Sequence, residues 1–218
     1  MREILVAPSI LSADFAAMGE AVEKLERAGA DMIHCDVMDG SFVPKITFGS
    51  DMVAAVRRHT SLPLDVHLMC VQPQNKIETF AAEGASRITV HFEATIDKTR
   101  EVLQSIRALG VKAGLSVSPD TPVKSIYDVL PYADMLLVMS VYPGRGGQKL
   151  IERTLAKAEE AYSFLESSGL CCDIEMDGGI TEANAAQVIA AGVNILVAGN
   201  TVFSAKDMAA TIRRLKNA

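Results

Sequence analysis

The sequence predicts a (β/α)8 barrel, the TIM-barrel class of α/β fold. Eight short apolar runs alternate with amphipathic stretches along the chain, with a period of roughly 27 residues, which suits one strand–helix unit. Nearly continuous apolar strands are typical of parallel sheets that helices cover. An open doubly wound sheet would normally carry Gly-x-Gly-x-x-Gly after its first strand, whereas this chain reads Pro8-Ser9-Ile10-Leu11-Ser12-Ala13-Asp14 there.

The first half of the chain supplies four strand–helix units. The predicted strands cover residues 4–11, 32–38, 64–69 and 88–92, and the predicted helices cover about 15–28, 51–59, 74–83 and 97–109. The apolar face of the first helix repeats every three or four residues, while charged residues take the other face. Its members are Phe15, Met18, Val22 and Leu25. Glycine follows the first, third and fourth helices, as expected at a helix end.

The second half repeats the same pattern. The predicted strands cover residues 112–117, 135–141, 172–177 and 195–198, and the predicted helices cover about 123–130, 151–167, 184–191 and 206–215. Each strand candidate is a short run containing apolar residues, and a longer stretch suited to a helix follows it. Since no linker or low-complexity segment interrupts the series, we expect residues 1–218 to form a single catalytic domain.

Composition and charge restrict the possible partners. Hydrophobic residues make up 49% of the 218 residues and charged residues 22%, as in ordinary globular proteins. The formal net charge of −6 argues against nucleic acid, because a phosphate backbone requires a basic surface. No apolar run is long enough for a membrane span, and the N-terminus lacks a secretory pattern. The cysteines form no Cys-x-x-Cys pair, so we expect a cytoplasmic protein with free thiols.

Histidine and carboxylate side chains gather where predicted strands end. The active site of a (β/α)8 barrel lies at the carboxyl ends of its strands, and side chains two residues apart share a face. Imidazole and carboxylate ligands suit a divalent transition metal, and two carboxylates neutralise its charge. We therefore predict one divalent metal ion per subunit. Zn²⁺ and Fe²⁺ are the preferred candidates, and Mn²⁺ and Co²⁺ are the alternatives. The predicted ligands of the ion are His34, Asp36, His67 and Asp177.

Glycine-bearing loops follow the sixth, seventh and eighth predicted strands. Glycine lets backbone amides approach an anion closely, and the phosphate site of a barrel usually follows strands seven and eight. We therefore expect a small phosphorylated ligand in this region. The predicted contacts are Gly144, Gly146, Gly147, Gly178, Gly179, Gly199 and Asn200.

Four segments resemble the ribulose-phosphate 3-epimerase family, and the resemblance spans essentially the whole chain. They are Pro8-Ser9-Ile10-Leu11-Ser12-Ala13-Asp14-Phe15, His34-x-Asp36-Val37-Met38-Asp39-Gly40-x-Phe42-Val43-Pro44, Asp65-Val66-His67-Leu68-Met69 and Asp177-Gly178-Gly179-Ile180. The resemblance implies the same four metal ligands and a homo-oligomer, from dimer to hexamer. His91 also matches the family, and we interpret it as a buried polar group of the core.

The resemblance also implies roles for individual residues. Asp36 and Asp177 would be the catalytic acid and base, and Ser9 and His67 would contact the substrate. Three methionines would cap the reacting carbon. They are Met38, Met69 and Met139.

Epimerisation at carbon 3 of a ketose phosphate fits these residues chemically. The reaction removes a proton next to a carbonyl group, and a metal acting as a Lewis acid stabilises the enediolate that results. One ionised and one protonated carboxyl on opposite faces of the substrate allow proton removal and return without moving it. We predict that Asp36 and Asp177 do this for the conversion of D-ribulose 5-phosphate to D-xylulose 5-phosphate, with the initial base left open.

The loop after the sixth predicted strand departs from the family. The family usually reads Val-Asn-Pro-Gly-Phe-Gly-Gly-Gln, whereas this chain has Tyr142 at the asparagine and Arg145 at the phenylalanine. Two interpretations of Arg145 are open. Its side chain either pairs with a phosphate or carboxylate group, or it points into solvent. The departure leaves another ketose phosphate as an alternative substrate, such as allulose 6-phosphate or a shorter sugar.

Two other functions stand as alternatives. A related sugar-phosphate decarboxylase would carry a lysine between acids at the end of the second strand, and residues 34–39 contain none. A non-catalytic sugar-phosphate-binding barrel would not need metal ligands.

Overall fold

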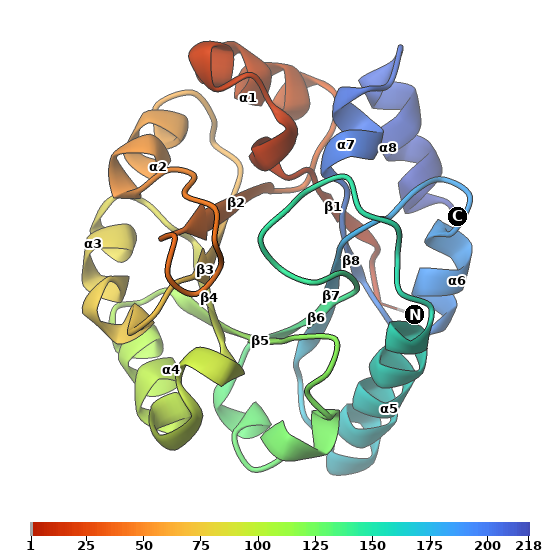
Figure 1. The fold of residues 1–218 in the computed structure, drawn as a ribbon. Coiled ribbons are helices and arrows are strands. Elements are labelled where there is room, and N and C mark those ends of the chain that lie inside the picture. Colours follow the sequence, from red (N-terminus) through yellow and green to blue (C-terminus); the bar gives the residue numbers. More distant parts are fainter. Residues whose placement is uncertain (1) are drawn as a thin grey trace.

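The computed structural model describes residues 2–218, in which eight parallel strands form one sheet (Figure 1). The strands are β1 (Leu5–Ala7), β2 (Ile33–Met38), β3 (Leu64–Met69), β4 (Arg87–His91), β5 (Lys112–Val117), β6 (Met135–Met139), β7 (Asp173–Asp177) and β8 (Ile195–Val197). Their order is β1-β8-β7-β6-β5-β4-β3-β2. A parallel bridge between Ser9 and His34 joins the two outer members, β1 and β2. The sheet therefore closes, and the predicted (β/α)8 barrel is confirmed.

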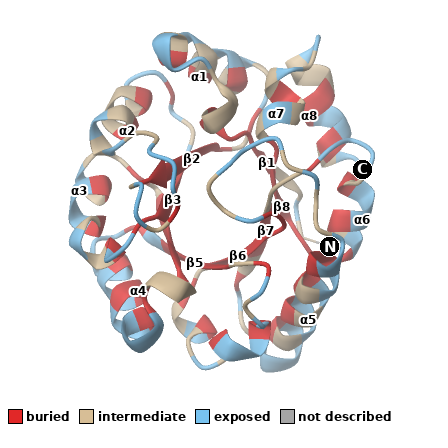
Figure 2. Cartoon of the chain, in the orientation of Figure 1, coloured by how far each residue is buried: buried red, intermediate tan, exposed pale blue. Residues whose placement is uncertain are grey.

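Helices surround the barrel on its outside (Figure 1). They are α1 (Met18–Arg27), α2 (Ser50–Arg57), α3 (Ile77–Ala82), α4 (Thr99–Ala108), α5 (Arg153–Ser168), α6 (Ala185–Ala190), α7 (Gly199–Phe203) and α8 (Met208–Lys216). Figure 2 shows that the strands are buried and that the helices bury their inner faces and expose their outer faces. None of the helices within residues 2–218 is long and apolar enough to cross a membrane.

The core has two parts because alternate strand residues point to opposite sides of the sheet. Val37, Val66 and Val138 point outward and belong to the large cluster that packs between strands and helices. Leu137 and Ile195 belong to a smaller cluster inside the barrel. Several inward-pointing positions toward the carboxyl ends of β2, β3 and β7 are polar instead, namely His34, Asp36, His67, Glu175 and Asp177. The fold thus places these side chains at one end of the barrel interior.

Two predicted elements differ from the structure. The run at 4–11 is a strand only over Leu5–Ala7, because Pro8 has no N–H for the ladder and the chain turns into a 3₁₀ helix at Ile10–Ser12. The helix predicted at 123–130 is wrong. Two 3₁₀ turns, Val123–Ile126 and Leu130–Tyr132, lie there, and Pro131 in the second lacks the N–H that a longer helix would use.

One short helix was not predicted. α7 follows β8 directly and begins with Gly199 and Asn200, which are poor helix formers. Its five residues are too few to show an amphipathic repeat. The other helices and strands agree with the predicted ones within a few residues at their ends.

Candidate active site

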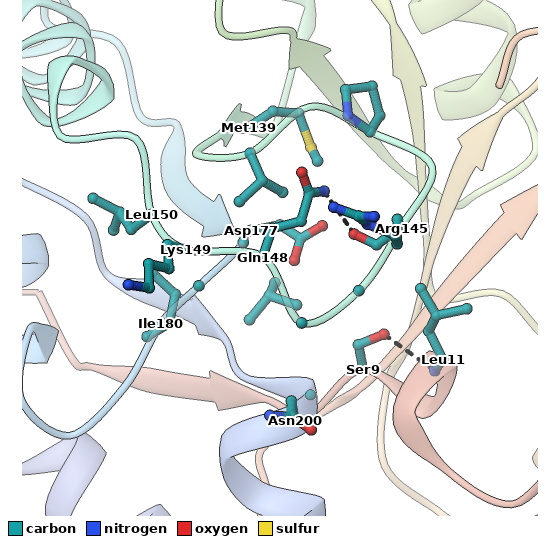
Figure 3. A pocket seen from close by; sticks show the side chains of 18 of the residues that line it. Ser9, Leu11, Met139, Arg145, Gln148, Lys149, Leu150, Asp177, Ile180 and Asn200 are labelled. Atoms are coloured by element: carbon teal, nitrogen blue, oxygen red, sulfur yellow. Dashed lines mark hydrogen bonds between the residues drawn. The ribbon is translucent and has the colours of Figure 1, made fainter.

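A cavity of about 460 Å³ opens at the carboxyl ends of the strands. Ser9, Asp36 and Asp177 line it, and the loop from β6 to α5 passes across it (Figure 3). Every predicted methionine and loop contact also lines the cavity. These residues are Met38, Met69, Met139, Gly144, Gly146, Gly147, Gly178, Gly179, Gly199 and Asn200. The residues chosen from the sequence for substrate contact therefore surround one space, except for His67, which is buried behind it.

The four predicted metal ligands lie together, and we call them the ligand cluster: His34, Asp36, His67 and Asp177. One ligand atom from each lies within 4.8 Å of the others. The β2–β3 register places Asp36 beside His67, and the β6–β7 register places Met139 beside Asp177. Both imidazoles are fully buried, whereas the two carboxylates reach the cavity.

The donor atoms of the ligand cluster suit a divalent cation. Nδ1 of His34 is paired with Asp65 Oδ2 at 2.8 Å, but Nε2 has no hydrogen-bond partner within residues 2–218. That nitrogen lies 3.3 Å from Asp36 Oδ1, and His67 Nδ1 lies 3.0 Å from the same oxygen. Two imidazole nitrogens and two carboxylates converge on one point, which is a donor set for zinc, iron, cobalt or manganese. These residues could therefore hold a metal ion.

The two cavity carboxylates have opposite electrostatic surroundings. Burial and the negative charge of Asp36 raise the pKa of Asp177 to about 7. Burial would also raise the pKa of Asp36, but its interactions with the imidazoles of His34 and His67, at 3.3 Å and 3.0 Å from Oδ1, outweigh burial and lower that pKa. Without a cation, the site therefore carries one ionised carboxyl and one that is half protonated near neutral pH.

The loops after β6 and β7 pack closely together at the cavity. Gly179 has a φ of +67°, and a Cβ there would lie 2.3 Å from the backbone nitrogen of Leu150. No other residue fits this approach, because the left-handed conformation is strained and the contact involves backbone. The amides of Gly179, Gly199 and Asn200 donate no hydrogen bond within the described residues. These amides are thus available to a ligand in the cavity.

Two carboxyl groups behind the ligand cluster were not among the predicted site residues. Asp65 accepts from His34, and Glu175 Oε1 lies 3.6 Å from the same nitrogen, Nδ1. Glu175 is fully buried, and burial and the charge of Asp65 raise its pKa to about 8. The sequence did hold a signal for them, because Asp65 precedes His67 by two positions on β3 and Glu175 precedes Asp177 by two on β7.

The two residues that depart from the family lie on the same loop in different settings. The Tyr142 hydroxyl donates to the carboxylate of Asp120 at 3.0 Å and accepts from Arg153 at 3.2 Å. Arg145 is exposed and lines the cavity. Gln148 donates hydrogen bonds to the carbonyl oxygens of both residues, at 2.8 Å for Tyr142 and 2.7 Å for Arg145. The side chain of Gln148 thus holds the loop through two of its carbonyl oxygens, and within residues 2–218 no hydrogen bond engages the guanidinium of Arg145.

Known structures of low sequence identity share the fold. A 3-hexulose-6-phosphate synthase superposes with a TM-score of 0.69 at 18% identity, covering 99% of each chain. The tryptophan synthase A-subunit from Pyrococcus furiosus gives a TM-score of 0.73 at 13% identity, covering 99% of this chain and 98% of that one. These similarities support the barrel fold but do not indicate an activity.

Sequence relatives are much more similar. A chloroplastic ribulose-5-phosphate-3-epimerase from Arabidopsis thaliana is 50% identical over 216 residues, covering 98% of this chain and 76% of the relative. The ribulose-phosphate 3-epimerase of Bacillus subtilis is 47% identical over 214 residues, covering 98% of each chain. A family model described as the ribulose-phosphate 3 epimerase family matches residues 5–203. The resemblance noted in the sequence is therefore confirmed, and the chain belongs to the ribulose-phosphate 3-epimerase family, whose members are isomerases of carbohydrates.

Proposed function

We propose that this chain converts D-ribulose 5-phosphate to D-xylulose 5-phosphate in a single barrel domain, using one divalent metal ion held by the ligand cluster. The observation that carries the proposal is the convergence of four ligand atoms within 4.8 Å at the cavity that Asp36 and Asp177 line. Family membership supports the reaction. When bound, the ion supplies Lewis-acid stabilisation of the negative charge that develops on the enediolate.

Asp36 and Asp177 would move the protons. They come from β2 and β7, which are separated in the sheet by β1 and β8, so the two carboxyls approach the cavity from different strands. One carboxylate takes the proton from carbon 3, and the other carboxyl returns a proton on the opposite face. The substrate then inverts its configuration without turning over.

Apolar side chains would protect the intermediate from water. Met38, Met69 and Met139 are each at most 3% exposed, and they line the cavity beside the two carboxyls. Thioethers are apolar and polarisable, so they fill this space without offering a competing base. Exclusion of water limits loss of the transferred proton to solvent.

The phosphate would bind at the other side of the cavity. The unpaired amides of Gly179, Gly199 and Asn200 offer donors to phosphate oxygens, as backbone amides of glycine loops do at anion sites. Arg145 adds a positive charge at the cavity rim. This supports a phosphorylated sugar as the substrate.

Proton exchange into the substrate tests the proposal. Ribulose 5-phosphate would be incubated in D₂O with the metal-loaded enzyme, with the chelated enzyme and with the chelated enzyme after metal is restored. NMR would follow both the sugar and its label. We expect deuterium at carbon 3, and xylulose 5-phosphate as product, in the first and third samples only. Exchange with a hexulose or tetrulose phosphate but not with ribulose 5-phosphate would show that the substrate is that sugar phosphate instead. The absence of exchange with every sugar in metal-loaded enzyme would contradict epimerase chemistry and favour a binding protein.

A further inference from the structure

A line of hydrogen bonds leads from the ligand cluster to a carboxylate away from the cavity. Nε2 of His67 lies 2.9 Å from Nε2 of His91, and Nδ1 of His91 lies 3.1 Å from Oε2 of Glu93. Both imidazoles are fully buried, and their ring centroids lie 5.0 Å apart with the ring planes inclined by 28°. His67 lies on β3, His91 ends β4, and Glu93 lies in the 3₁₀ turn Phe92–Ala94 that follows. Four groups of the site and its surroundings are thus connected in series, from Asp36 to Glu93.

Glu93 acts as an acceptor at both oxygens. Its Oε1 accepts from the backbone N–H of Ser118 at 2.8 Å and from the hydroxyl of Thr121. Burial alone would raise the pKa of Glu93, but hydrogen bonds from His91, Thr121 and Ser118 outweigh it and lower the pKa to about 2. An ionised carboxylate has no proton to donate. The nitrogen of His91 that faces it must therefore be the donor.

The position of that proton determines the next one along the line. A neutral imidazole has one N–H and one lone pair. With its proton on Nδ1, His91 has only a lone pair at Nε2, so His67 must donate through its own Nε2. Nδ1 of His67 then keeps its lone pair, and it faces Asp36 Oδ1 at 3.0 Å. The lone pair of His67 Nδ1 and the oxygen of Asp36 are then both acceptors, and a cation bound by both would stabilise their proximity.

We propose that Glu93 is a positioning residue, which fixes through His91 the tautomer of His67 that presents Nδ1 to the metal. This inference rests on the proposed metal site. Histidine ligands usually donate their second nitrogen directly to a carboxylate or carbonyl, as His34 does to Asp65. His67 reaches its carboxylate through a second imidazole instead. His91 is thereby more than a buried polar group of the core.

The substitution Glu93→Gln tests the proposal because it keeps the shape and changes the donors. The amide N–H of Ser118 can only donate, so the side-chain oxygen of the new glutamine is held at that side. Its NH₂ group then faces His91 Nδ1 and demands an acceptor there. The proton of His91 moves to Nε2, and His67 is driven to carry its proton on Nδ1, where it blocks the metal. We expect zinc to bind about 10- to 100-fold more weakly, the range seen when the support of a metal ligand is removed.

Two measurements separate this role from a merely structural one. Zinc affinity would be measured by calorimetry at about pH 8, since bound metal requires unprotonated imidazoles. The nitrogen that carries each proton would be read by ¹⁵N NMR of histidine-labelled, metal-free protein, which has only four histidines to assign. Glu101→Gln, an exposed change on α4, is the matched control and should alter neither readout.

A second variant tests the coupling through His91. The side-chain oxygen of a glutamine at position 91 can accept from His67 Nε2 whatever residue stands at position 93. In the His91→Gln background, Glu93→Gln should therefore change zinc affinity by less than about threefold, because the two sites no longer act as one unit. An equal loss in both backgrounds would show that Glu93 supports the fold only, and would overturn the proposal.

The wild-type protein provides an independent test even where a variant fails to fold. We expect protons on Nδ1 of His91 and Nε2 of His67 at about pH 8. A proton on Nε2 of His91 would overturn the proposal, as would unchanged zinc affinity in the folded Glu93→Gln variant. If wild-type protein shows the expected protons but binds no metal, the proposed metal site fails while the assignment of the protons stands.

Discussion

The hydroxyl of Ser9 donates a hydrogen bond of 2.6 Å to Asp36 Oδ2, and both side chains line the cavity. Ser9 follows β1, and its bridge to His34 is also the contact that closes the barrel between β1 and β2. The same hydroxyl oxygen accepts from the backbone N–H of Leu11 and so caps the 3₁₀ helix Ile10–Ser12. One residue therefore ties barrel closure to the carboxylate that we propose for proton transfer.

Loss of the Ser9 hydroxyl should reduce catalysis without unfolding the barrel. In Ser9→Ala, Asp36 loses a charge-assisted hydrogen bond that stabilises its ionised form, so its pKa rises and its orientation is less fixed. We expect kcat to fall about tenfold or more, because the carboxylate is no longer held in one orientation. The pKa of Asp36 is held well below its ordinary value, so kcat should fall by a similar factor at every pH from about 5 to 9. An undiminished kcat would show that Ser9 has no part in orienting Asp36.

Neutral isosteres of the two carboxyls that we propose for catalysis should remove activity. Asp36→Asn and Asp177→Asn each delete a group proposed both to transfer a proton and to bind the metal, and we expect turnover to fall by at least about 10²- to 10⁴-fold. Epimer formation and zinc content would be measured together, so that loss of proton transfer is separated from loss of metal. Asp51→Asn, an exposed change on α2, serves as the control. Near-native turnover in either active-site variant would refute the assigned roles.

Metal binding should release protons. The pKa of Asp177 is raised to about 7, so a cation that needs its carboxylate must displace a proton below that pH. Affinity should therefore fall as pH decreases below about 7, by up to tenfold per pH unit. Calorimetry in buffers of different ionisation enthalpy counts the protons released. Constant affinity between about pH 5.5 and pH 8 would show that Asp177 is already ionised in the metal-free site.

The same carboxyl should affect the stability of the metal-free protein. Its pKa rises from 3.8, the ordinary value, to about 7 on folding, so folding favours the protonated form. That contribution is fully present below about pH 4 and is lost as pH rises through about 7, with a total on the order of 2–4 kcal/mol. The free energy of unfolding of wild type, compared with Asp177→Asn by urea titration, should therefore decline over this range. A difference that does not vary with pH would contradict the raised pKa.

Much of the fold and of the ligand cluster could be predicted because both depend on simple repeats. The alternation of strand and helix indicates the barrel, and the barrel places the ends of β2, β3 and β7 at one rim. His34, Asp36, His67 and Asp177 then follow from their places on those strands. Their proximity in the structure agrees with that reasoning. Oligomeric state and cellular location stay predictions.

Other features depend on contacts that no local pattern reveals. Glu93 lies in a 3₁₀ turn after β4, and its partners Ser118 and Thr121 come from the next strand–helix unit, 25 and 28 residues away. Its position therefore cannot be read from periodicity. The helix predicted at 123–130 is replaced by two 3₁₀ turns, because the proline at position 131 cannot donate the hydrogen bond that a longer helix needs.

Arg145 should contribute to substrate affinity more than to turnover. Its guanidinium is exposed and lines the same cavity as Gly199 and Asn200, so it could pair with a phosphate bound there. In Arg145→Ala we expect KM for ribulose 5-phosphate to rise about tenfold while kcat changes less, because Arg145 is not among the groups proposed to move the protons. Arg145→Phe, which restores the usual family residue, tests whether an aromatic ring replaces that contribution. Steady-state kinetics of both variants with pentulose and hexulose phosphates would distinguish these cases. An unchanged KM in both would assign Arg145 to solvent and leave substrate selection to the rest of the cavity.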